Sequence, residues 1–403
     1  ASADYVEEDD KKEEMQEENA SNEQKNKKQK ISYRDPYAYS IFIGSTVGKK
    51  EKESDADKDI YGLYQLYQSE LYKEKSGEDK GATVKTSMDG NLQEYAYELL
   101  AAYEKRGAIT VLEAKTGKIK ACVFTPSYDA NTLESGWIDQ LAEEGGYIKP
   151  LSVPVVPGSI YKIITSMGIL ENGLEDQVIK DEGTLSLEEN LVLNNSGGAA
   201  WGPISLEQGF IHSSNVYFGT MGKDYLKKDK MQELAQRCLI GKTLDFDFGR
   251  VVSKFEIDDS PSSLAWTAIG QGKVELTVMN AAMIVQAVAN DGIMMKPYGV
   301  EAIYHGEGEN RIYYKQSRAE TYKTITTPEV AGRLKEIMKS TGEYYTKNLT
   351  GNSTIYAGEK NISIGLKTGT GQITSSGDNH SSWIASMAPA DDPEYVVVMN
   401  LYD

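Results

Sequence analysis

The chain has 403 residues, of which 39% are hydrophobic and 26% are charged, and its formal net charge is −18. This composition provides a sizeable hydrophobic core, so two domains or one large domain are expected. The strong negative charge argues against nucleic acid as the main partner. Because the chain has only 3 His and 2 Cys, we expect no metal site and no cofactor.

Two further classes of feature are absent from the sequence. No run of about 18 apolar residues occurs, so no membrane-spanning helix is predicted, and no signal peptide is recognised. Cys122 and Cys238 lie outside any Cys-x-x-Cys or Cys/His cluster. We interpret both as buried residues, and a disulfide between them is the less favoured alternative.

The first part of the chain differs in composition from the rest. Residues 1–30 contain few large apolar side chains and mix both signs of charge, which predicts a flexible tail, with a solvated helix as the lesser alternative. Residues 31–81 are rich in tyrosine and are interrupted by the charged stretch 49–59. We interpret them as a small appended N-terminal segment that packs on something else. Residues 82–403 have the composition of a globular domain.

The globular part begins with a predicted helix over 91–107, whose apolar face is expected to carry Leu92, Tyr95, Leu99 and Tyr103. Two strands follow, 107–114 and 118–124, joined by Lys115-Thr116-Gly117. The glycine supplies the permissive backbone of a tight hairpin turn. This first Lys-Thr-Gly is therefore interpreted as a turn without a chemical role.

A second Lys-Thr-Gly starts at Lys367, within the segment 361–373 (NISIGLKTGTGQI). Apolar residues alternate there with small or polar ones, which predicts one half-buried strand. Lys367 is expected on the face opposite to the apolar side chains of that strand. Taken alone, the segment leaves open whether Lys367 is functional or is a solvated charge on an edge strand.

Ser159 is distinguished by a lysine three residues later, Lys162. Pro157-Gly158 marks the start of a helix, and Asn172-Gly173 marks its end. The simplest interpretation is a helix-capping serine followed by an ordinary lysine. However, a cation in the first turn costs about 0.3–1 kcal/mol against the helix dipole. The same dipole and burial would lower the pKa of Lys162, and a neutral lysine is a usable base for the Ser159 hydroxyl.

Ser213-Ser214-Asn215 is the single Ser-x-Asn of the chain. In this order, Ser-x-x-Lys, Ser-x-Asn and Lys-Thr-Gly form the motif set of class A β-lactamases and penicillin-binding proteins. The chain resembles the transpeptidase domain of penicillin-binding proteins over residues 82–403. The segments that carry the resemblance are VKTSMDGNLQ (84–93), AITVLEAKTGKIKACVFTPSYDAN (108–131), VPGSIYK (156–162), IGQGKVELTVMNAAMIVQAVANDG (269–292) and SSWIASMAPADDPEYVVVMN (381–400).

This resemblance implies an α/β (α+β) fold of the β-lactamase/transpeptidase type, with a central antiparallel sheet and a helical cluster. The short N-terminal part is similar to a reduced pedestal of a class B-like protein. The active site is then expected between the Lys367 strand and the Ser159 helix. His212, His305 and His380 have no role in the motifs and are interpreted as surface or packing residues.

The family's mechanism implies acyl transfer through a serine ester. Ser159 is the expected nucleophile and Lys162 the base that takes its proton. Ser213 is expected to relay a proton to the leaving nitrogen. Asn215 is expected to hold Lys162 and the substrate amide, and Lys367 to keep the groove positive.

The resemblance also implies which residues bind the substrate. The hydroxyls of Thr368 and Thr370 are expected to bind its carboxylate, and Gly369 to leave space for it along the strand. The backbone N–H groups of Ser159 and Thr370 resemble the family's oxyanion hole. Strict alternation would direct the Thr368 side chain toward the core, so a twist or bulge near Gly369 would be needed to turn its hydroxyl toward the substrate.

The substrate expected from the resemblance is a peptidoglycan stem peptide ending in D-Ala-D-Ala, and β-lactams should acylate the same serine. A β-lactam sensor, a D,D-carboxypeptidase and a slow scaffold in a wall-synthesis complex are the alternatives. The stretch 189–194 (ENLVLN) departs in length and position from the deacylating loop of class A β-lactamases, which disfavours β-lactam hydrolysis. Membrane-embedded wall-synthesis proteins are expected partners, at the outer face of a bacterial membrane, with an anchor that lies outside this chain.

Overall fold

The computed structural model describes residues 3–5, 31–33, 35–43, 62–67, 82–131, 153–247, 249–358, 360–372 and 380–402. Strand β1 (Ala3–Tyr5) pairs antiparallel with β2 (Ile31–Tyr33). The rest of the tail predicted over 1–30 lies outside the described residues.

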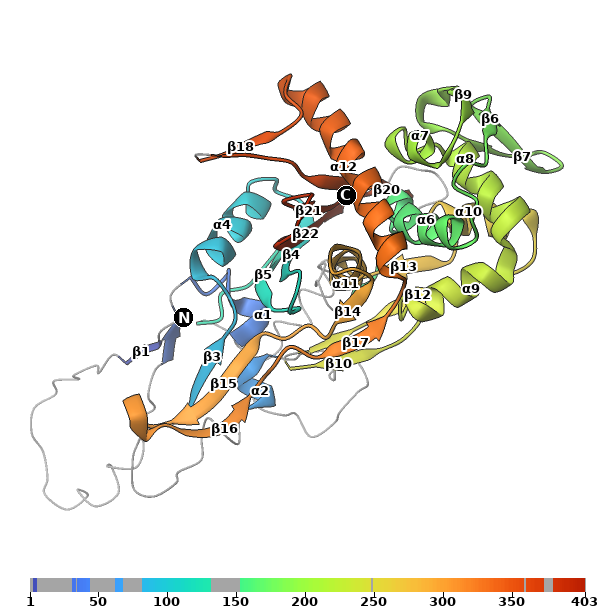
Figure 1. The fold of residues 1–403 in the computed structure, drawn as a ribbon. Helices are drawn as coiled ribbons and strands as arrows, with labels where there is room; N and C mark the ends of the chain where they lie inside the picture. The colour runs from blue at the N-terminus through green and yellow to red at the C-terminus, as the bar shows by residue number, and fades with distance from the viewer. Residues whose placement is uncertain are drawn as a thin grey trace, which may run out of the picture.

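A five-stranded antiparallel sheet forms the centre of the molecule, in the order β20–β21–β22–β4–β5 (Figure 1). Its strands are β4 (Arg106–Glu113), β5 (Ile119–Thr125), β20 (Gly365–Gln372), β21 (His380–Ala388) and β22 (Tyr395–Tyr402). The predicted hairpin is confirmed, because β4 pairs with β5 around the first Lys-Thr-Gly, where Gly117 has φ +75°. The pairing is regular from β20 to β4, whereas the register of β4 with β5 shifts between Val111 and Leu112.

Helices cover both faces of this sheet (Figure 1). Helix α4 (Gly90–Ala101) packs on one face, against Ile109, Val111 and Val123. Helices α11 (Val278–Ala289) and α12 (Pro328–Thr350) lie on the other side, where the main hydrophobic core includes Leu112, Cys122 and Val398. The sheet is thus buried between two helical layers, which confirms the predicted α+β class.

The apolar face predicted for the first helix was wrong. Tyr95 and Leu99 are 63% and 41% exposed, whereas Gln93, Ala96 and Leu100 are buried. The Gln93 side chain donates to the Cys122 carbonyl at 2.9 Å and accepts from the Cys122 N–H at 2.8 Å. A glutamine that bonds to the edge strand β5 therefore determines which face of the helix is buried.

A helical cluster lies beyond β20, the strand that carries the second Lys-Thr-Gly (Figure 1). Its helices are η3 (Gly158–Tyr161), α6 (Lys162–Glu171), α7 (Leu206–Ile211), α8 (Asn215–Thr220), the π-helical η5 (Met221–Leu226), α9 (Lys227–Arg237) and α10 (Pro261–Ala268). Two small antiparallel pairs accompany them, β6 (Ile179–Asp181) with β9 (Gly202–Ile204), and β7 (Thr184–Glu188) with β8 (Leu191–Asn194), followed by η4 (Ser196–Gly198). The predicted nucleophile helix is present, with a 3₁₀ first turn.

The remaining strands form small sheets around the core. They are the three-stranded β16 (Ile312–Gln316)–β15 (Val300–His305)–β3 (Thr83–Thr86), with η6 (Gly308–Asn310), and the pairs β10 (Leu244–Phe246)–β11 (Gly249–Val251), β12 (Ser253–Phe255)–β13 (Val274–Leu276), β14 (Ile293–Met295)–β17 (Thr321–Thr324) and β18 (Ile355–Ala357)–β19 (Lys360–Ile362).

The single strand predicted over 361–373 was wrong in its first part. Residues 360–362 pair with β18, Ser363 and Ile364 leave the sheet, and β20 begins at Gly365. A Cβ atom on Gly342 of α12 would lie 1.8 Å from the Ile364 carbonyl oxygen. The close crossing of α12 thus coincides with the break between the two strands.

The described residues of the N-terminal segment contact the main body. They include the short helices α1 (Ser40–Ile43) and α2 (Leu63–Leu66). The hydroxyls of Ser40 and Ser127 lie 2.7 Å apart, and the Tyr67 hydroxyl donates to the Asp247 carbonyl at 3.1 Å. The described residues 35–43 and 62–67 thus lie against the main body, and the assignment of residues 31–81 as one segment, like the three domain boundaries, stays a prediction.

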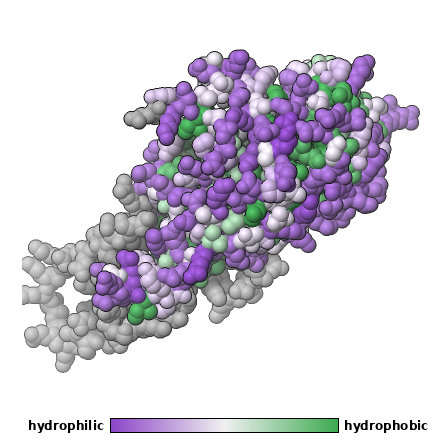
Figure 2. All heavy atoms as spheres, viewed as in Figure 1, coloured by the Kyte–Doolittle hydropathy of each residue, from purple (hydrophilic) through white to green (hydrophobic). Residues whose placement is uncertain are grey.

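Cys122 and Cys238 are both buried free thiols, which excludes the disulfide alternative. Within the described ranges, no helix combines the length and apolar character needed to cross a membrane. The face of the molecule seen in Figure 2 is mostly hydrophilic, with small separate hydrophobic patches, as expected for a strongly charged chain.

Candidate active site

Ser159 lies in the 3₁₀ turn η3, and Lys162 begins helix α6 directly after it. Pro157 precedes the turn, and no side-chain capping bond is made there, so Ser159 is not a capping serine. The carbonyl of Val156 accepts hydrogen bonds from the Ser381 hydroxyl at 2.6 Å and the Trp383 indole at 2.9 Å. Strand β21 therefore fixes the segment that leads into Ser159.

The turn that carries Ser159 packs directly against strand β20. Gly158 has φ +54°, and a Cβ atom there would lie 2.2 Å from the Thr370 carbonyl oxygen. A Cβ atom on Gly369 would lie 2.9 Å from the Pro157 carbonyl oxygen. Both glycines are needed at this crossing, because any side chain would push the strand away from the Ser159 turn.

Ser213 and Asn215 connect helices α7 and α8, with Ser213 in the left-handed conformation at φ +54°. The Lys162 amino group donates to the Ser213 carbonyl at 2.7 Å, to the Ser213 hydroxyl at 3.3 Å and to Asn215 Oδ1 at 2.8 Å. The Ser-x-x-Lys and Ser-x-Asn motifs thus meet through Lys162.

Lys367 of β20 reaches the same hydroxyl from the other side. Its Nζ donates to Ser213 Oγ at 2.9 Å and to the Thr368 carbonyl at 3.0 Å. Both Lys162 and Lys367 have 0% exposure. Lys367 is therefore not a solvated edge charge, and the structure brings all three motifs together around Ser213.

Burial changes the protonation of both lysines. The pKa of Lys162 is held well below its usual range by loss of hydration and by the charge of Lys367, while Asp181 opposes the shift. Loss of hydration lowers the pKa of Lys367 to about 7. Burial and the charge of Lys367 both favour a neutral Lys162, whereas Lys367, with a pKa of about 7, keeps much of its positive charge just below neutral pH.

A cleft of about 530 Å³ opens over this cluster. Its walls include all the predicted site residues except the two buried lysines, namely Ser159, Ser213, Asn215, Thr368, Gly369 and Thr370. No Asp or Glu side chain lines it within the part of the chain that the structure describes. A negatively charged substrate group therefore meets no like charge on these walls.

The expected orientation of Thr368 was wrong. The pairing of β20 with β21 is regular from Gly365 to Gln372, so no bulge occurs at Gly369. Lys367 and Gly369 are buried, whereas Thr370 is exposed and Thr368 is half-buried. The two threonines line the cleft because the buried face of β20 is the one that carries the lysine and the glycine.

Several cleft residues carry no signal in the three motifs. His212 and His380 both line the cleft, in contrast to their interpretation as surface or packing residues. The His212 ring stacks on Trp201 at 3.9 Å between centroids. Gln271 donates to the Thr370 carbonyl at 3.1 Å and accepts from the Gln372 N–H at 3.3 Å, so it occupies part of the open edge of β20. Gln271 lies in the Gly-Gln-Gly sequence of the segment 269–292, one of the segments that resemble the family, so its place in the site could have been inferred from the sequence.

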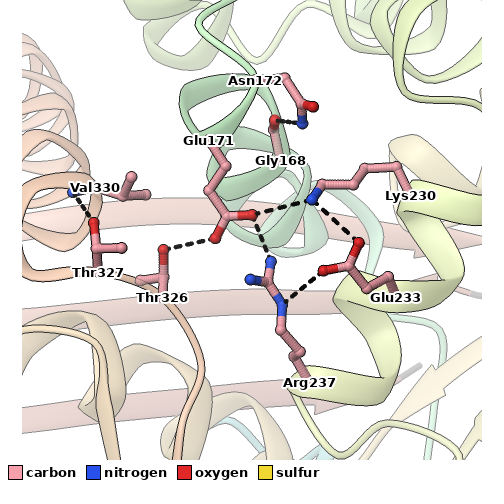
Figure 3. Close-up of polar contacts among 9 residues, drawn as sticks. All are labelled: Gly168, Glu171, Asn172, Lys230, Glu233, Arg237, Thr326, Thr327 and Val330. Atoms are coloured by element: carbon pink, nitrogen blue, oxygen red, sulfur yellow. Dashed lines mark hydrogen bonds and ion pairs between the residues drawn. The ribbon is translucent and has the colours of Figure 1, made fainter.

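The far end of the Ser159 helix is anchored by charges (Figure 3). Glu171, the last residue of α6, accepts from Arg237 at 2.5 Å and from the Thr326 hydroxyl at 2.8 Å, and Lys230 lies at 3.7 Å. The carboxylate links α6 to α9 and to the segment before α12. This network fixes the far end of the helix whose first residue is Lys162.

The comparisons with known proteins agree with this geometry. The family model of the penicillin-binding protein transpeptidase domain matches residues 107–403. The chain belongs to this family.

Across the residues that the structure describes, no group of three or more His, Cys, Asp or Glu side chains is placed to hold a metal ion.

Relatives of this penicillin-binding protein family lie at moderate identity. The peptidoglycan D,D-transpeptidase PbpA of Mycolicibacterium smegmatis is 26% identical over 92% of this chain and 78% of its own length. PbpA of Mycobacterium tuberculosis is 27% identical over 79% of this chain and 67% of its own length.

Solved structures share the fold. The D,D-transpeptidase domain of a peptidoglycan glycosyltransferase from Eggerthella lenta has 25% identity and a TM-score of 0.77, covering 93% of this chain and 88% of that one. Penicillin-binding protein A from M. tuberculosis, in its ceftriaxone acyl-enzyme complex, has 23% identity and a TM-score of 0.78, covering 93% of this chain and 87% of that one. The β-lactamase/transpeptidase-like architecture is thereby confirmed.

Proposed function

We propose that the chain is a serine D,D-transpeptidase, which cross-links peptidoglycan stem peptides through an acyl-enzyme on Ser159 and is acylated by β-lactams. One observation carries the proposal: two buried lysines donate hydrogen bonds to the Ser213 hydroxyl, and Ser213 lines the same cleft as Ser159. Membership of the transpeptidase family and relatives named peptidoglycan D,D-transpeptidase support it.

In the acylation step, Ser159 Oγ attacks the carbonyl carbon between the two terminal D-alanines. Its proton passes to Lys162, whose lowered pKa keeps it neutral before the reaction. A neutral amine close to a hydroxyl is the usual means of activating a serine without histidine. The negative oxygen that develops is assigned to the backbone N–H groups of Ser159 and Thr370, and one such donor is typically worth about 10²–10³ in rate.

The proton then has to reach the leaving amine. Ser213 Oγ lies 3.3 Å from Lys162 Nζ, within reach for a relay from Lys162 to the nitrogen of the departing D-alanine. Asn215 Oδ1, at 2.8 Å, holds the lysine in place during this exchange. The C–N bond breaks, D-alanine leaves as a neutral amine, and the serine ester remains.

Substrate binding follows from charge and from the open face of β20. Lys367 supplies positive charge beneath the strand, and the Thr368 and Thr370 hydroxyls line the cleft where a terminal carboxylate would lie. An amine of a second stem peptide then attacks the ester and releases Ser159. The absence of a carboxylate on the described walls supports slow attack by water, because none of these walls offers a carboxylate base for it.

The location and partners belong to the same proposal. A peptidoglycan substrate places the protein outside the bacterial cytoplasm, and membrane-embedded wall-synthesis proteins are proposed partners. The domain arrangement proposed is a tail over 1–30, a small N-terminal segment over 31–81 and the transpeptidase domain over 82–403. The family model, which begins at residue 107, lies entirely within the last of these.

The first experiment is labelling with a fluorescent penicillin. Wild type should form a stable covalent adduct, and Ser159→Ala should form none. Ser196→Ala is the matched control, because Ser196 lines the same cleft and has no proposed role in the chemistry. Labelling of Ser159→Ala at the wild-type level would remove Ser159 from the mechanism.

A second assay separates the alternatives. The protein is given a peptide ending in D-Ala-D-Ala, with and without an amine acceptor, and the products are resolved by mass. Cross-linked product supports the transpeptidase, whereas D-alanine release that ignores the acceptor indicates a carboxypeptidase. Stable penicillin labelling without either product indicates a sensor or a scaffold.

A further inference from the structure

A buried carboxylate beside the cleft has no place in the three motifs. Asp181 ends strand β6 and is 1% exposed. It accepts hydrogen bonds from the Gly183 N–H at 2.8 Å, from Asn195 Nδ2 at 2.8 Å to each oxygen, and from the Ser214 hydroxyl at 2.6 Å. Burial of an ionised carboxylate is unfavourable unless its oxygens accept hydrogen bonds, and these four bonds satisfy the oxygens of Asp181.

One of these bonds goes to the middle residue of the Ser-x-Asn motif. Ser214 Oγ donates to Asp181 and accepts from the Tyr217 N–H at 2.9 Å. The hydroxyl proton is therefore directed at the carboxylate, and the same oxygen caps helix α8. Ser214 lies between Ser213 and Asn215, so its anchoring also limits where those two side chains point.

A second route passes through Asn195. Its Nδ2 group bonds to Asp181, which turns its Oδ1 toward helix α8, where it accepts from the Asn215 N–H at 2.7 Å and the Val216 N–H at 3.0 Å. The Asn215 side chain is held between the Asn194 carbonyl, at 2.8 Å from its Nδ2, and Lys162. Asp181 is thus connected to Lys162 by two routes, one through Ser214 and one through Asn195 and Asn215. The Asp181 carboxylate itself does not line the cleft.

Asp181 also acts on Lys162 through its charge. Its carboxylate raises the pKa of Lys162, against burial and the charge of Lys367, which lower it. It also acts on the His212 imidazole, whose pKa is lowered by burial overall. The other charged groups packed on α6 face its far end, where Lys230 and Arg237 of α9 contact Glu171 and Arg333 of α12 contacts Glu175.

We propose that Asp181 is a positioning residue for the acylation reaction, which holds the Ser-x-Asn loop in register with Lys162 and places a buried negative charge behind that lysine. This inference rests on the proposed function, because it assigns Lys162 as the base for Ser159. Asp181 itself touches neither substrate nor the nucleophile.

The test compares the isosteric variant Asp181→Asn with Asp181→Ala. Glu182→Gln is the matched control, because Glu182 is the neighbouring carboxylate and its side chain is 65% exposed. The second-order rate of acylation by fluorescent penicillin is measured from pH 4 to 10 for each variant and for wild type. Far-ultraviolet circular dichroism and the thermal midpoint establish that each variant is folded.

Asp181→Asn should move the pH at which the rate rises to half its maximum lower by about half a unit, because Lys162 loses a stabilising negative charge. Asp181→Ala should show the same shift and should also lower the maximal rate by about 10–100-fold, the range found when groups that orient a reactive ligand are removed. Glu182→Gln should match wild type in both respects.

An unchanged midpoint in a folded Asp181→Asn protein would overturn the counter-charge role, and an unchanged maximal rate in Asp181→Ala would overturn the positioning role. If neither variant folds, Asn195→Ala, which cuts the link from Asp181 to Asn215, supplies the rate test with the same criterion. Failure of the proposed function has a different signature, namely labelling that survives in Ser159→Ala.

Discussion

Lys162 and Lys367 donate hydrogen bonds to one hydroxyl, that of Ser213, at 3.3 and 2.9 Å, although both lysines are fully buried. Two ammonium groups at this separation would repel each other strongly in a poorly hydrated site. This repulsion favours a neutral form of one of them, and burial together with the charge of Lys367 lowers the pKa of Lys162. This asymmetry separates a base from a charge carrier, and the predictions below depend on it.

The two Lys-Thr-Gly sequences should differ sharply on substitution. Lys367→Ala should slow penicillin acylation by about 10²–10³, because it removes the buried charge beneath the carboxylate site. Lys115→Ala should leave the rate within about twofold, since the Lys115 side chain is 51% exposed in a hairpin turn and lies 3.9 Å from Asp291. Stopped-flow or gel-based labelling rates give the comparison, and equal effects would contradict the assignment.

The acylation rate should depend on pH with a descending limb near neutrality. Lys367 has a pKa of about 7, so its positive charge, which attracts the penicillin carboxylate, is present below that pH and lost above it. The lowered pKa of Lys162 favours its neutral form, so Lys162 remains an available base. The second-order rate measured from pH 5 to 10 should fall above about pH 7. A rate that climbs steadily to pH 9 would show that Lys367 is not the charge carrier.

Lys367→Met should make the protein more stable near pH 7, because it removes a buried ionisable group from the native state. The unfolded lysine binds its proton up to about pH 10.5, and the folded one only to about pH 7. Between these values the unfolded state holds more protons, so wild-type stability rises with pH relative to the variant, by at most about 1.4 kcal/mol per pH unit. Urea midpoints at pH 7, 8.5 and 10 should show the variant's advantage shrinking; a constant difference would contradict the shift.

Gly158→Ala should lower acylation by about 10²-fold or more. The new methyl group would lie 2.2 Å from the Thr370 carbonyl oxygen, so the Ser159 turn and β20 would have to separate. Gly173→Ala is the control, because Gly173 also has positive φ, at +64°, but a Cβ atom there meets nothing within 4 Å. Both variants carry backbone strain of about 1–2 kcal/mol, and only Gly158→Ala should lose labelling when both are folded.

Glu171→Gln should destabilise the protein by about 2–4 kcal/mol. The substitution leaves Arg237 without its main partner in a site where the Glu171 side chain is only 11% exposed. Glu233→Gln provides the control, since Glu233 contacts the same arginine and lysine but is 50% exposed, and less than about 1 kcal/mol is expected. Urea unfolding monitored by tryptophan fluorescence gives both values. Similar losses for the two variants would mean that the network in Figure 3 does not anchor α6.

Local features of the chain were predictable because they depend on short stretches of sequence. The hairpin around Gly117 follows from two strands that flank a turn triplet, and the Ser159 helix follows from its Pro-Gly start and its Asn-Gly end. The order of the three motifs was sufficient to indicate the family, since each motif is short and their combination is rare. The apolar face of α4 was predicted wrongly, because hydrophobicity alone does not reveal that Gln93 bonds to strand β5.

The sequence by itself therefore indicated the candidate reactive groups, namely Ser159, Lys162, Ser213 and Lys367, together with the helix that carries Ser159 and the strand that carries Lys367. Only the tertiary structure decided that the two lysines are buried, that Thr368 faces the cleft without a bulge, and that Asp181 lies behind the Ser-x-Asn loop. The physical reason is distance along the chain. Ser213 meets Lys162 across 51 residues and Lys367 across 154, and no local propensity encodes the packing that removes water from such a contact.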